Sequence, residues 1–573
     1  MYRSFFSLPG LVSRFTTLSA APKETERTGI DIVPALPLAL LVFLPLAYYM
    51  ADAYPGRPYA ALRYFAIPLA GFSAGASLFL FIIRSRSARL GEWLASLQGI
   101  DGRRAVFYAV LFHVFFFAAL SALKYSSAHF TGYDFGIYDS KIWLISRSSF
   151  YDKFSLASSV HFQPALLIYS FLYGIAAHPL VLQFSQSAAV ASGAAPLFLT
   201  ARKLLKTGYL AAGLSLFYLL YPSVEFNAAG DFHPDNLYIP LMLWAFYFIE
   251  TGRYFLLPLV ILPALGLKEP LVPGVLLTGL YMAVKNKGRL AGAAVFVFSA
   301  AVFFLAVYAL SGGGWAKGFN DQSFQHLRAG SLSAVFKEAF DPAKLRFPFF
   351  LLFPVLGLPL LRPLEFMPAL PALAAALLSS SAHHQNVASH YTAGVIPYLF
   401  FALIHGFRTL EQRTSERHVF GAGAWVFALI ISFNVAHSPG PLSAAFWAKP
   451  WSDGGWHYSN YMETPHDRIV AEAIRLVPED PDISVVSHDK VYDKRLGHRR
   501  SFKVFPQGFP GADFILLDNE RGPFLHDSPD LEGYGAAFLS LTSSLDYIKV
   551  FEKHGVYVFA KRRRTLDKTA MPD

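Results

Sequence analysis

The sequence predicts an α-helical polytopic membrane protein that carries a small α/β domain at its C-terminal end. Of its 573 residues, 54% are hydrophobic and only 15% are charged, and its mean hydropathy is +0.38. Soluble domains average about 25% charged residues, so this composition indicates many membrane spans. After about residue 437, long apolar runs give way to short strand-like runs and turns.

The net charge of +10 needs no nucleic acid partner. Cytoplasmic loops of membrane proteins accumulate Lys and Arg, which accounts for a basic balance. The absence of cysteine excludes disulfides, thiol nucleophiles and thiolate metal sites. Residues 1–30 are expected to form a basic cytoplasmic segment rather than a transit peptide, and no removable signal peptide is predicted.

A membrane span needs about 20 mostly apolar residues, and about 13 runs meet or approach that length. Several of them are short and interrupted by proline. The runs lie at 31–50, 64–83, 104–124, 180–201, 206–222, 236–250, 254–267, 270–284, 290–310, 347–361, 364–380, 392–407 and 419–436.

Basic clusters in the short loops predict the orientation of these spans. Clusters at 84–104, 202–206, 285–289 and 408–417 should all face the cytoplasm. They can do so together only if the further apolar run at 163–178 does not cross. The prediction is a multi-pass protein of the cell (plasma or inner) membrane with 13 crossings and a cytoplasmic N-terminus. Its transmembrane domain covers 31–436, and loop 125–164 faces outward.

Residues 437–573 are expected to form a small extracytoplasmic α/β domain. Helical spacing covers 465–476, and strand-like runs cover 483–487, 512–518 and 547–560. An aromatic-rich stretch precedes them and could stack on a sugar or form a membrane-interface belt. Its members are Phe446, Trp447, Trp451 and Trp456.

Two aspartates stand out in the outer loop 125–164, within Tyr-Asp-Phe-Gly-Ile-Tyr-Asp at 133–139. A carboxylate can accept a proton from a hydroxyl as a general base or help to bind a hard divalent cation. Asp134 and Asp139 are therefore the candidate catalytic residues. The alternative is that they cap the helix expected from about Ser140.

Asp231, His233 and Asp235 alternate at the entrance to another span, on the same predicted outer face. This pattern can present metal ligands or hydrogen bonds to a sugar, although Asp235 could also act as a helix cap. Asp134, Asp231 and His233 are the candidate ligands for a divalent metal, Mg or Mn.

Three further polar motifs fall on this face, at Lys268-Glu269, His161 and His390-Tyr391. Lys268 and Glu269 interrupt an apolar stretch, and ionisable residues at membrane depth usually mark a site or an ion pair. Lys268 could hold a lipid phosphate as a point charge. His161, His390 and Tyr391 are candidate substrate-binding residues, with structural hydrogen bonding as the alternative.

The order of these motifs resembles a family of uncharacterised prokaryotic polytopic membrane proteins, domain of unknown function 2079, which is grouped with the GT-C glycosyltransferase superfamily. The resemblance covers about residues 105–410 and rests on the motifs at 133–139, 161–164, 231–234, 268–269 and 390–391.

This resemblance implies a GT-C-like fold, a large first outer loop with an essential acidic residue, and a polyprenyl-phosphate-linked sugar as donor. Asp134 matches the acidic residue, with Asp139 as the alternate, although Ser140 stands where related proteins often carry Gln. The expected function is a membrane glycosyltransferase that transfers a sugar to an acceptor on the extracytoplasmic side. The alternatives are a transporter or lipid-linked sugar flippase, which the absence of an internal repeat disfavours, and a non-catalytic scaffold.

Overall fold

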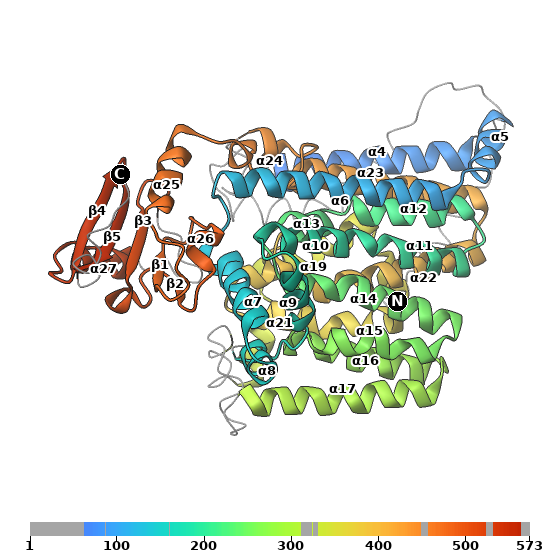
Figure 1. Cartoon of the computed structure of the whole chain (residues 1–573). Helices are drawn as coiled ribbons and strands as arrows, with labels where there is room; N and C mark the ends of the chain where they lie inside the picture. The colour runs from blue at the N-terminus through green and yellow to red at the C-terminus, as the bar shows by residue number, and fades with distance from the viewer. Residues whose placement is uncertain are drawn as a thin grey trace.

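The computed structural model shows a bundle of helices with a five-stranded sheet at one end (Figure 1). The structure describes residues 62–85, 88–159, 161–310, 324, 331–448, 456–522 and 531–562. The predicted first span, 31–50, lies outside them. The largest hydrophobic core lies among the bundle helices, and smaller cores fill the C-terminal domain.

Four helices are long and apolar enough to cross a membrane in the described part of the chain. They contain α4 (Ile67–Arg84), α6 (Gly102–Ser126), α17 (Arg289–Leu310) and α23 (Glu416–His437). The predicted number of about 13 crossings is therefore not confirmed. The physical reason is that proline and glycine divide most other apolar runs into shorter helices.

These shorter helices fill the bundle between the long ones. α10 and α11 are separated only by Gly193, and Pro263 lies inside α15. Their bounds are α5 (Ala88–Leu97), α10 (Pro179–Ser192), α11 (Ala194–Leu204), α12 (Gly208–Leu219), α13 (Pro222–Ala229), α14 (Tyr238–Thr251), α15 (Leu257–Leu265), α16 (Val272–Val284), α18 (Leu332–Ala339), α19 (Pro342–Leu352), α20 (Pro363–Phe366), α21 (Leu370–Leu378), α22 (Ile396–Arg413) and α24 (Ala444–Trp447).

The predicted outer loop 125–164 is largely helical. It contains the π-helical turn η2 (Gly132–Gly136), α7 (Ile137–Arg147) and α8 (Phe150–Ala157). The next apolar segment forms α9 (Leu166–Ile175), whose ten residues span about 15 Å. This is about half of a bilayer core of roughly 30 Å. Several predicted spans contain helices that are equally short, so the non-crossing of 163–178 stays a prediction.

The C-terminal domain is a mixed sheet with the strand order β2-β1-β3-β5-β4. β1 is parallel to β2 and β3, whereas β5 is antiparallel to β3 and β4. The run 547–560, expected as one strand, is a hairpin that turns at His554 and Gly555, and β2 was not predicted. The elements are α25 (Pro465–Arg475), β1 (Val485–Ser487), α26 (Lys494–Gly497), β2 (Phe502–Val504), β3 (Phe514–Asp518), α27 (Leu531–Thr542), β4 (Tyr547–Lys553) and β5 (Val556–Lys561).

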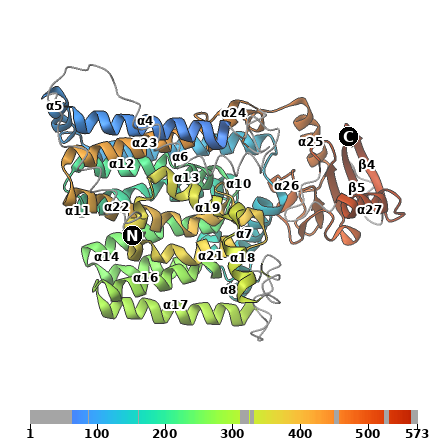
Figure 2. The same ribbon diagram turned by 180° about the vertical axis from the view of Figure 1, so that it is seen from behind.

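The C-terminal domain contacts the bundle through the segment that follows α6. Both views show the sheet at the end of the bundle next to α7 (Figures 1 and 2). The amide of Gly132 donates to the carbonyl oxygen of Asp489 at 2.5 Å, and the amide of Tyr133 donates to its carboxylate at 2.7 Å. The C-terminal domain is thereby fixed against the turn that carries Asp134.

Candidate functional site

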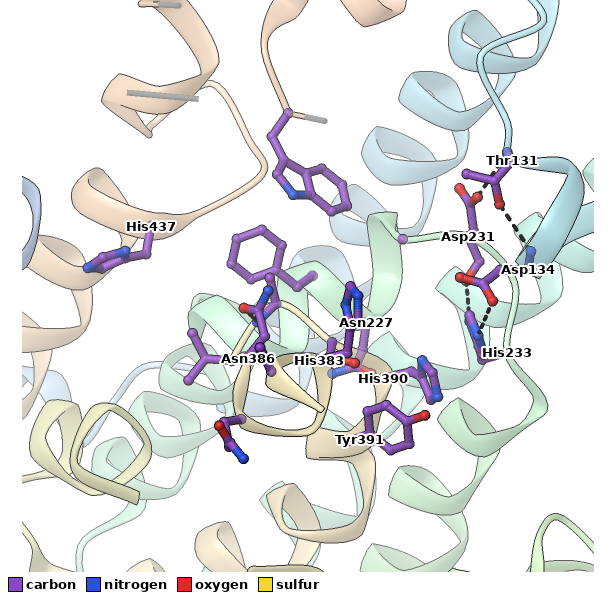
Figure 3. A pocket seen from close by; sticks show the side chains of 18 of the residues that line it. Thr131, Asp134, Asn227, Asp231, His233, His383, Asn386, His390, Tyr391 and His437 are labelled. Atoms are coloured by element: carbon purple, nitrogen blue, oxygen red, sulfur yellow. Dashed lines mark hydrogen bonds and ion pairs between the residues drawn. The ribbon is translucent and has the colours of Figure 1, made fainter. Parts of the chain in front are cut away.

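A cavity of about 840 Å³ lies between the end of the bundle and the C-terminal domain. Its walls come from the turn before α4, the ends of α6 and α13, the turn η2, α19, the segment 382–391 and the loops after β1 and β3. Figure 3 shows Asp134, His233 and His390 facing this space from separate segments of the chain. Five of the predicted site residues line it: Asp134, Asp231, His233, His390 and Tyr391.

Asp134 is held at the cavity wall by the geometry of η2. The Thr131 hydroxyl accepts from the amides of Asp134 at 3.2 Å and Phe135 at 3.4 Å, which fixes the start of the turn. The Asp134 side chain remains 30% exposed, and its Oδ1 lies 3.8 Å from Nε2 of His233. A carboxylate in this position can reach both a cavity ligand and a histidine.

His233 is oriented for an ion pair with Asp134. Its Nδ1 lies 2.9 Å from the carbonyl oxygen of Asp231, which can only accept, so Nδ1 carries a hydrogen. Nε2 faces a carboxylate and therefore favours the protonated ring. Burial lowers the pKa of His233, but the charges of Asp134 and Asp235 outweigh it, and the pKa lies above its usual value.

His390 stacks on His233 with the ring centroids 3.6 Å apart and the planes at 12°. Burial, together with the positive charges of His233 and Lys268, holds the pKa of His390 well below its usual value. Two stacked imidazolium ions would repel each other strongly, so one charged and one neutral ring is the favoured state.

The carboxylate of Asp231 connects its own segment to the end of α6 and to the turn before Asp134. Its Oδ1 lies 2.5 Å from Nζ of Lys124 at the end of α6, and its Oδ2 accepts from the Thr131 amide at 3.1 Å. This carboxylate therefore aligns the chain that leads into Asp134.

Asp235 and Lys268 lie behind the cavity wall. Their side chains are buried, with Lys268 Nζ 3.5 Å from Asp235 Oδ2 and 5.5 Å from the ring centre of Tyr391. Burial lowers the pKa of Lys268, but Asp235 and nearby tyrosines raise it above the usual value. Lys268 does not line the cavity. Its contacts with the site run through Asp235 and through the ring of Tyr391, which lines the cavity.

Three predicted residues lie elsewhere. His161 Nδ1 is 2.7 Å from Glu269, whose second oxygen accepts from the Phe162 amide, so this pair connects two segments outside the cavity lining. Asp139 is fully buried, accepts short hydrogen bonds from Tyr173 and Tyr492, and lies 3.0 Å from His498. This carboxylate joins α7 and α9 to the C-terminal domain.

The predicted metal ligands Asp134, Asp231 and His233 are already engaged by neighbouring groups. Hard cations need several converging oxygen ligands, yet Asp231 is engaged by Lys124 and Thr131, and Asp134 by His233. Among the residues that the structure describes, no group of three or more His, Asp or Glu side chains could hold a metal ion. Divalent metal binding by Asp134, Asp231 and His233 therefore stays a prediction.

The cavity also contains cations that sequence reasoning missed. Arg63, Lys124, Arg346, Lys490 and Arg521 line it, against the two carboxylates of Asp134 and Asp231. Arg63, Lys124 and Arg346 begin or end apolar runs on the predicted outer face, where the positive-inside rule disfavours cations. The position of these three cations on the predicted outer face was therefore the feature of the sequence that could have identified them as site residues. Lys490 and Arg521 were not predictable without the loops of the sheet.

Aromatic side chains form part of the cavity wall. Trp456 lies edge-on to Phe226 with the centroids 5.1 Å apart, and both line the space. Of the other predicted stacking residues, Phe446 is buried, Trp447 is exposed outside the lining, and Trp451 lies outside the described residues. Among the members of this stretch that the structure describes, only Trp456 is placed where it could stack on a cavity ligand.

The protein has apolar helices that are long enough to cross a bilayer, and a charged cavity lies at the ends of these helices. These two features define an integral membrane protein with a polar site at one end of its bundle. The chain belongs to the family described as "Predicted membrane protein (DUF2079)", whose model matches residues 124–488. The match includes the cavity residues from Lys124 to Tyr391, and it ends before Lys490 and Arg521.

Comparison with curated proteins gave no match. Two structures of ArnT from Cupriavidus metallidurans are among the solved structures that match, one bound to undecaprenyl phosphate and one in the apo state. Each is 14% identical in sequence, and each alignment covers 78% of this chain and 97% of the other, with TM-scores of 0.46 and 0.43. These scores are too low to establish a shared fold, so the GT-C-like arrangement stays a prediction.

Proposed function

We propose that this protein is a membrane glycosyltransferase that transfers a sugar from a polyprenyl-phosphate donor to an acceptor hydroxyl at the extracytoplasmic end of the bundle. The observation that carries the proposal is the partly exposed Asp134–His233 pair on the wall of a cavity with five Lys and Arg side chains. The resemblance of the motifs to a family that is grouped with the GT-C superfamily supports the same reaction.

In the proposed reaction, Asp134 acts as the general base. Its partly exposed carboxylate accepts the proton of the acceptor hydroxyl while that oxygen attacks the anomeric carbon, and the bond to the donor phosphate breaks. The leaving phosphate gains negative charge, which the cavity cations stabilise. A direct displacement of this kind inverts the configuration at the anomeric carbon.

His233 and His390 would support the base rather than react. The His233 imidazolium would orient the Asp134 carboxylate through Nε2, and neutral His390 stacks on one face of the His233 ring. Trp456 and Phe226 offer the aromatic surface on which a sugar ring could lie.

Transport of a lipid-linked sugar is the alternative function, and the polar residues inside the bundle are the observation that bears on it. A second polar cluster lies beyond the cavity, where Nε2 of His405 is 3.7 Å from Glu250 and its Nδ1 is 3.9 Å from Glu365. Between Asp235 and Glu250, however, α14 packs its aromatic side chains tightly, and the rings of Phe246 and Phe401 stack at 3.9 Å. A transport path would have to open this packed region, so the transferase is favoured.

The proposal is tested with the full-length protein in nanodiscs, using radiolabelled polyprenyl-phosphate sugars and membrane extracts as the acceptor source. Asp134→Asn should reduce transfer by roughly 10²–10⁴-fold, as expected when a general base is lost. Asp152→Asn is the matched control, since Asp152 lies exposed on α8 of the same segment. Both variants should elute as folded protein.

Two results would contradict the proposal. Unchanged transfer in Asp134→Asn would remove Asp134 as the base. Movement of intact lipid-linked sugar across the membrane by the wild-type protein, without transfer to any acceptor, would favour the flippase. The anomeric configuration of the product, which should be inverted, provides an independent readout.

A further inference from the structure

A second cavity of about 500 Å³ lies at the contact between the bundle and the C-terminal domain. Its walls come from the end of α6, α7, the turn before α10, and α25 and α26. None of its lining residues lines the larger cavity. The proposed transfer reaction therefore leaves this space unexplained.

The charge in this cavity is unbalanced. Four cations line it, and only two carboxylates, Glu479 and Asp493, accompany them. Glu479 forms an ion pair with Arg495 at 2.9 Å. Asp493 accepts from the hydroxyl of Tyr125 at 3.0 Å and from the backbone amide of Arg495 at 2.7 Å. Both carboxylates are thus already engaged.

The other three cations, Arg147, Arg475 and Lys494, have no carboxylate partner among the residues that the structure describes. Arg147 is an exposed side chain whose guanidinium lies over the ring of Trp143, 4.9 Å from its centre, beside the cavity. Burial lowers the pKa of His178, which is next to the lining residue Ala177. The charge of Lys494 lowers this pKa further, against the opposing charges of Asp139 and Asp493. Three cations around one cavity favour an anionic ligand.

Apolar surface continues from this cavity along two helices. Leu123 on α6 is 49% exposed and precedes the lining residues Tyr125 and Ser126, while Ile175 on α9 is 75% exposed and precedes Ala177. Because α6 is long and apolar enough to span a membrane, its end lies near the level of the lipid head groups.

We propose that this cavity binds the phosphate head group of an anionic phospholipid of the surrounding membrane, such as phosphatidylglycerol. Arg147, Arg475 and Lys494 surround the phosphate, and the acyl chains follow the exposed apolar side chains of α6 and α9. A basic pocket at the ends of membrane helices is suited to such a lipid. A free phosphate would use the cations but not the adjoining apolar surface. The bound lipid would connect α6 and α7 to α25 and α26.

The test measures binding of short-chain phosphatidylglycerol to the full-length protein in neutral detergent, through the rise in unfolding temperature. Phosphatidylcholine of the same chain length, glycerol phosphate and undecaprenyl phosphate are the comparison ligands. Phosphatidylglycerol should stabilise the protein, whereas phosphatidylcholine and glycerol phosphate should do so far less. In the variant R147Q/R475Q/K494Q, affinity should fall on the order of a hundredfold, at about fivefold for each lost cation.

Two control variants make the outcome specific. Lys503→Gln removes an exposed cation on β2 outside the cavity and should bind phosphatidylglycerol like the wild type. Asp134→Asn should also bind it normally, which separates this site from the proposed reaction. If the triple variant does not fold, the single variant Lys494→Gln, at an exposed position, should still show the fivefold loss.

Several results would overturn the assignment. Equal responses to phosphatidylglycerol and phosphatidylcholine would exclude recognition of the head-group charge. An equal response to glycerol phosphate would indicate a free phosphate site, and a response to undecaprenyl phosphate alone would assign the cavity to the donor lipid. Undiminished phosphatidylglycerol binding in the triple variant would place the lipid elsewhere.

Discussion

Asp134 and His233 show how a loop aspartate becomes a candidate base. The Thr131 hydroxyl caps the turn before Asp134, and Asp231 fastens Thr131 to Lys124 at the end of α6. His233 then faces Asp134 because its other ring nitrogen is committed to a carbonyl oxygen. The contacts of the Thr131 hydroxyl and of His233 Nδ1 are local in the chain, whereas Asp231 and the Asp134–His233 pair connect distant segments. Together they orient one partly exposed carboxylate toward the cavity.

The ion pair predicts how His233 should titrate. Asp134→Asn removes the nearest negative charge, so burial should then dominate and the pKa of His233 should fall below its wild-type value. NMR titration of isotope-labelled histidine would measure the change. Asp152→Asn, remote from the pair, should leave His233 unchanged, and the same result for Asp134→Asn would show that the pair does not form.

At the scale of elements, glycines let two long helices approach closely. Gly71 and Gly75 of α4 are four residues apart and face Ser432 and Trp425 of α23. A Cβ atom added at Gly75 would lie 2.3 Å from Cδ1 of Trp425. Small residues at this spacing allow membrane helices to pack by van der Waals contact.

Gly75→Ala should therefore destabilise the bundle. Overpacking a close contact costs about 1–3 kcal/mol, which detergent-induced unfolding monitored by circular dichroism would detect. Gly174→Ala is the matched control, because nothing lies within 4 Å of its added Cβ. If both variants unfolded like the wild type, close packing at Gly75 would not contribute to stability.

At the scale of the whole molecule, one ionic cluster attaches the C-terminal domain to the end of α6. Arg521 donates to the carbonyl oxygens of Ser127 and Ala128 and pairs with Asp467 at 2.6 Å. Asp467 also lies 3.1 Å from Nε2 of His129. Burial raises the pKa of Asp467, but His129 and Thr464 outweigh it, and the pKa lies below its usual value.

This lowered pKa predicts an acid-sensitive attachment. A carboxylate whose folded pKa is depressed stabilises the protein fully above its unfolded pKa, about 4, and progressively less as the pH falls below it. The difference in unfolding temperature between the wild type and Asp467→Asn should therefore be largest near neutral pH and should shrink below about pH 4. Asp546→Asn, an exposed control, should track the wild type, and a constant difference for Asp467→Asn would exclude this linkage.

Much of the membrane character and of the site was readable from the sequence. Apolar runs identified α4, α6, α17 and α23, because such helices must cover about 20 residues with apolar side chains. The basic clusters placed the motifs around Asp134, His233 and His390 on one face, and the structure brings these three residues together. The local patterns of α25 and β3 were also sufficient to predict a small α/β domain.

The tertiary structure alone decided which polar residues share a cavity. Asp134 and Asp139 stand five positions apart in one motif, yet one faces the cavity and the other is buried among Tyr173, Tyr492 and His498. The directions of the Asp134 and Asp139 side chains depend on the backbone of η2 and α7. They also depend on contacts with the C-terminal domain, which lies hundreds of residues later in the chain. Composition and periodicity record which segments avoid water, whereas the convergence of side chains depends on packing between segments distant in the chain.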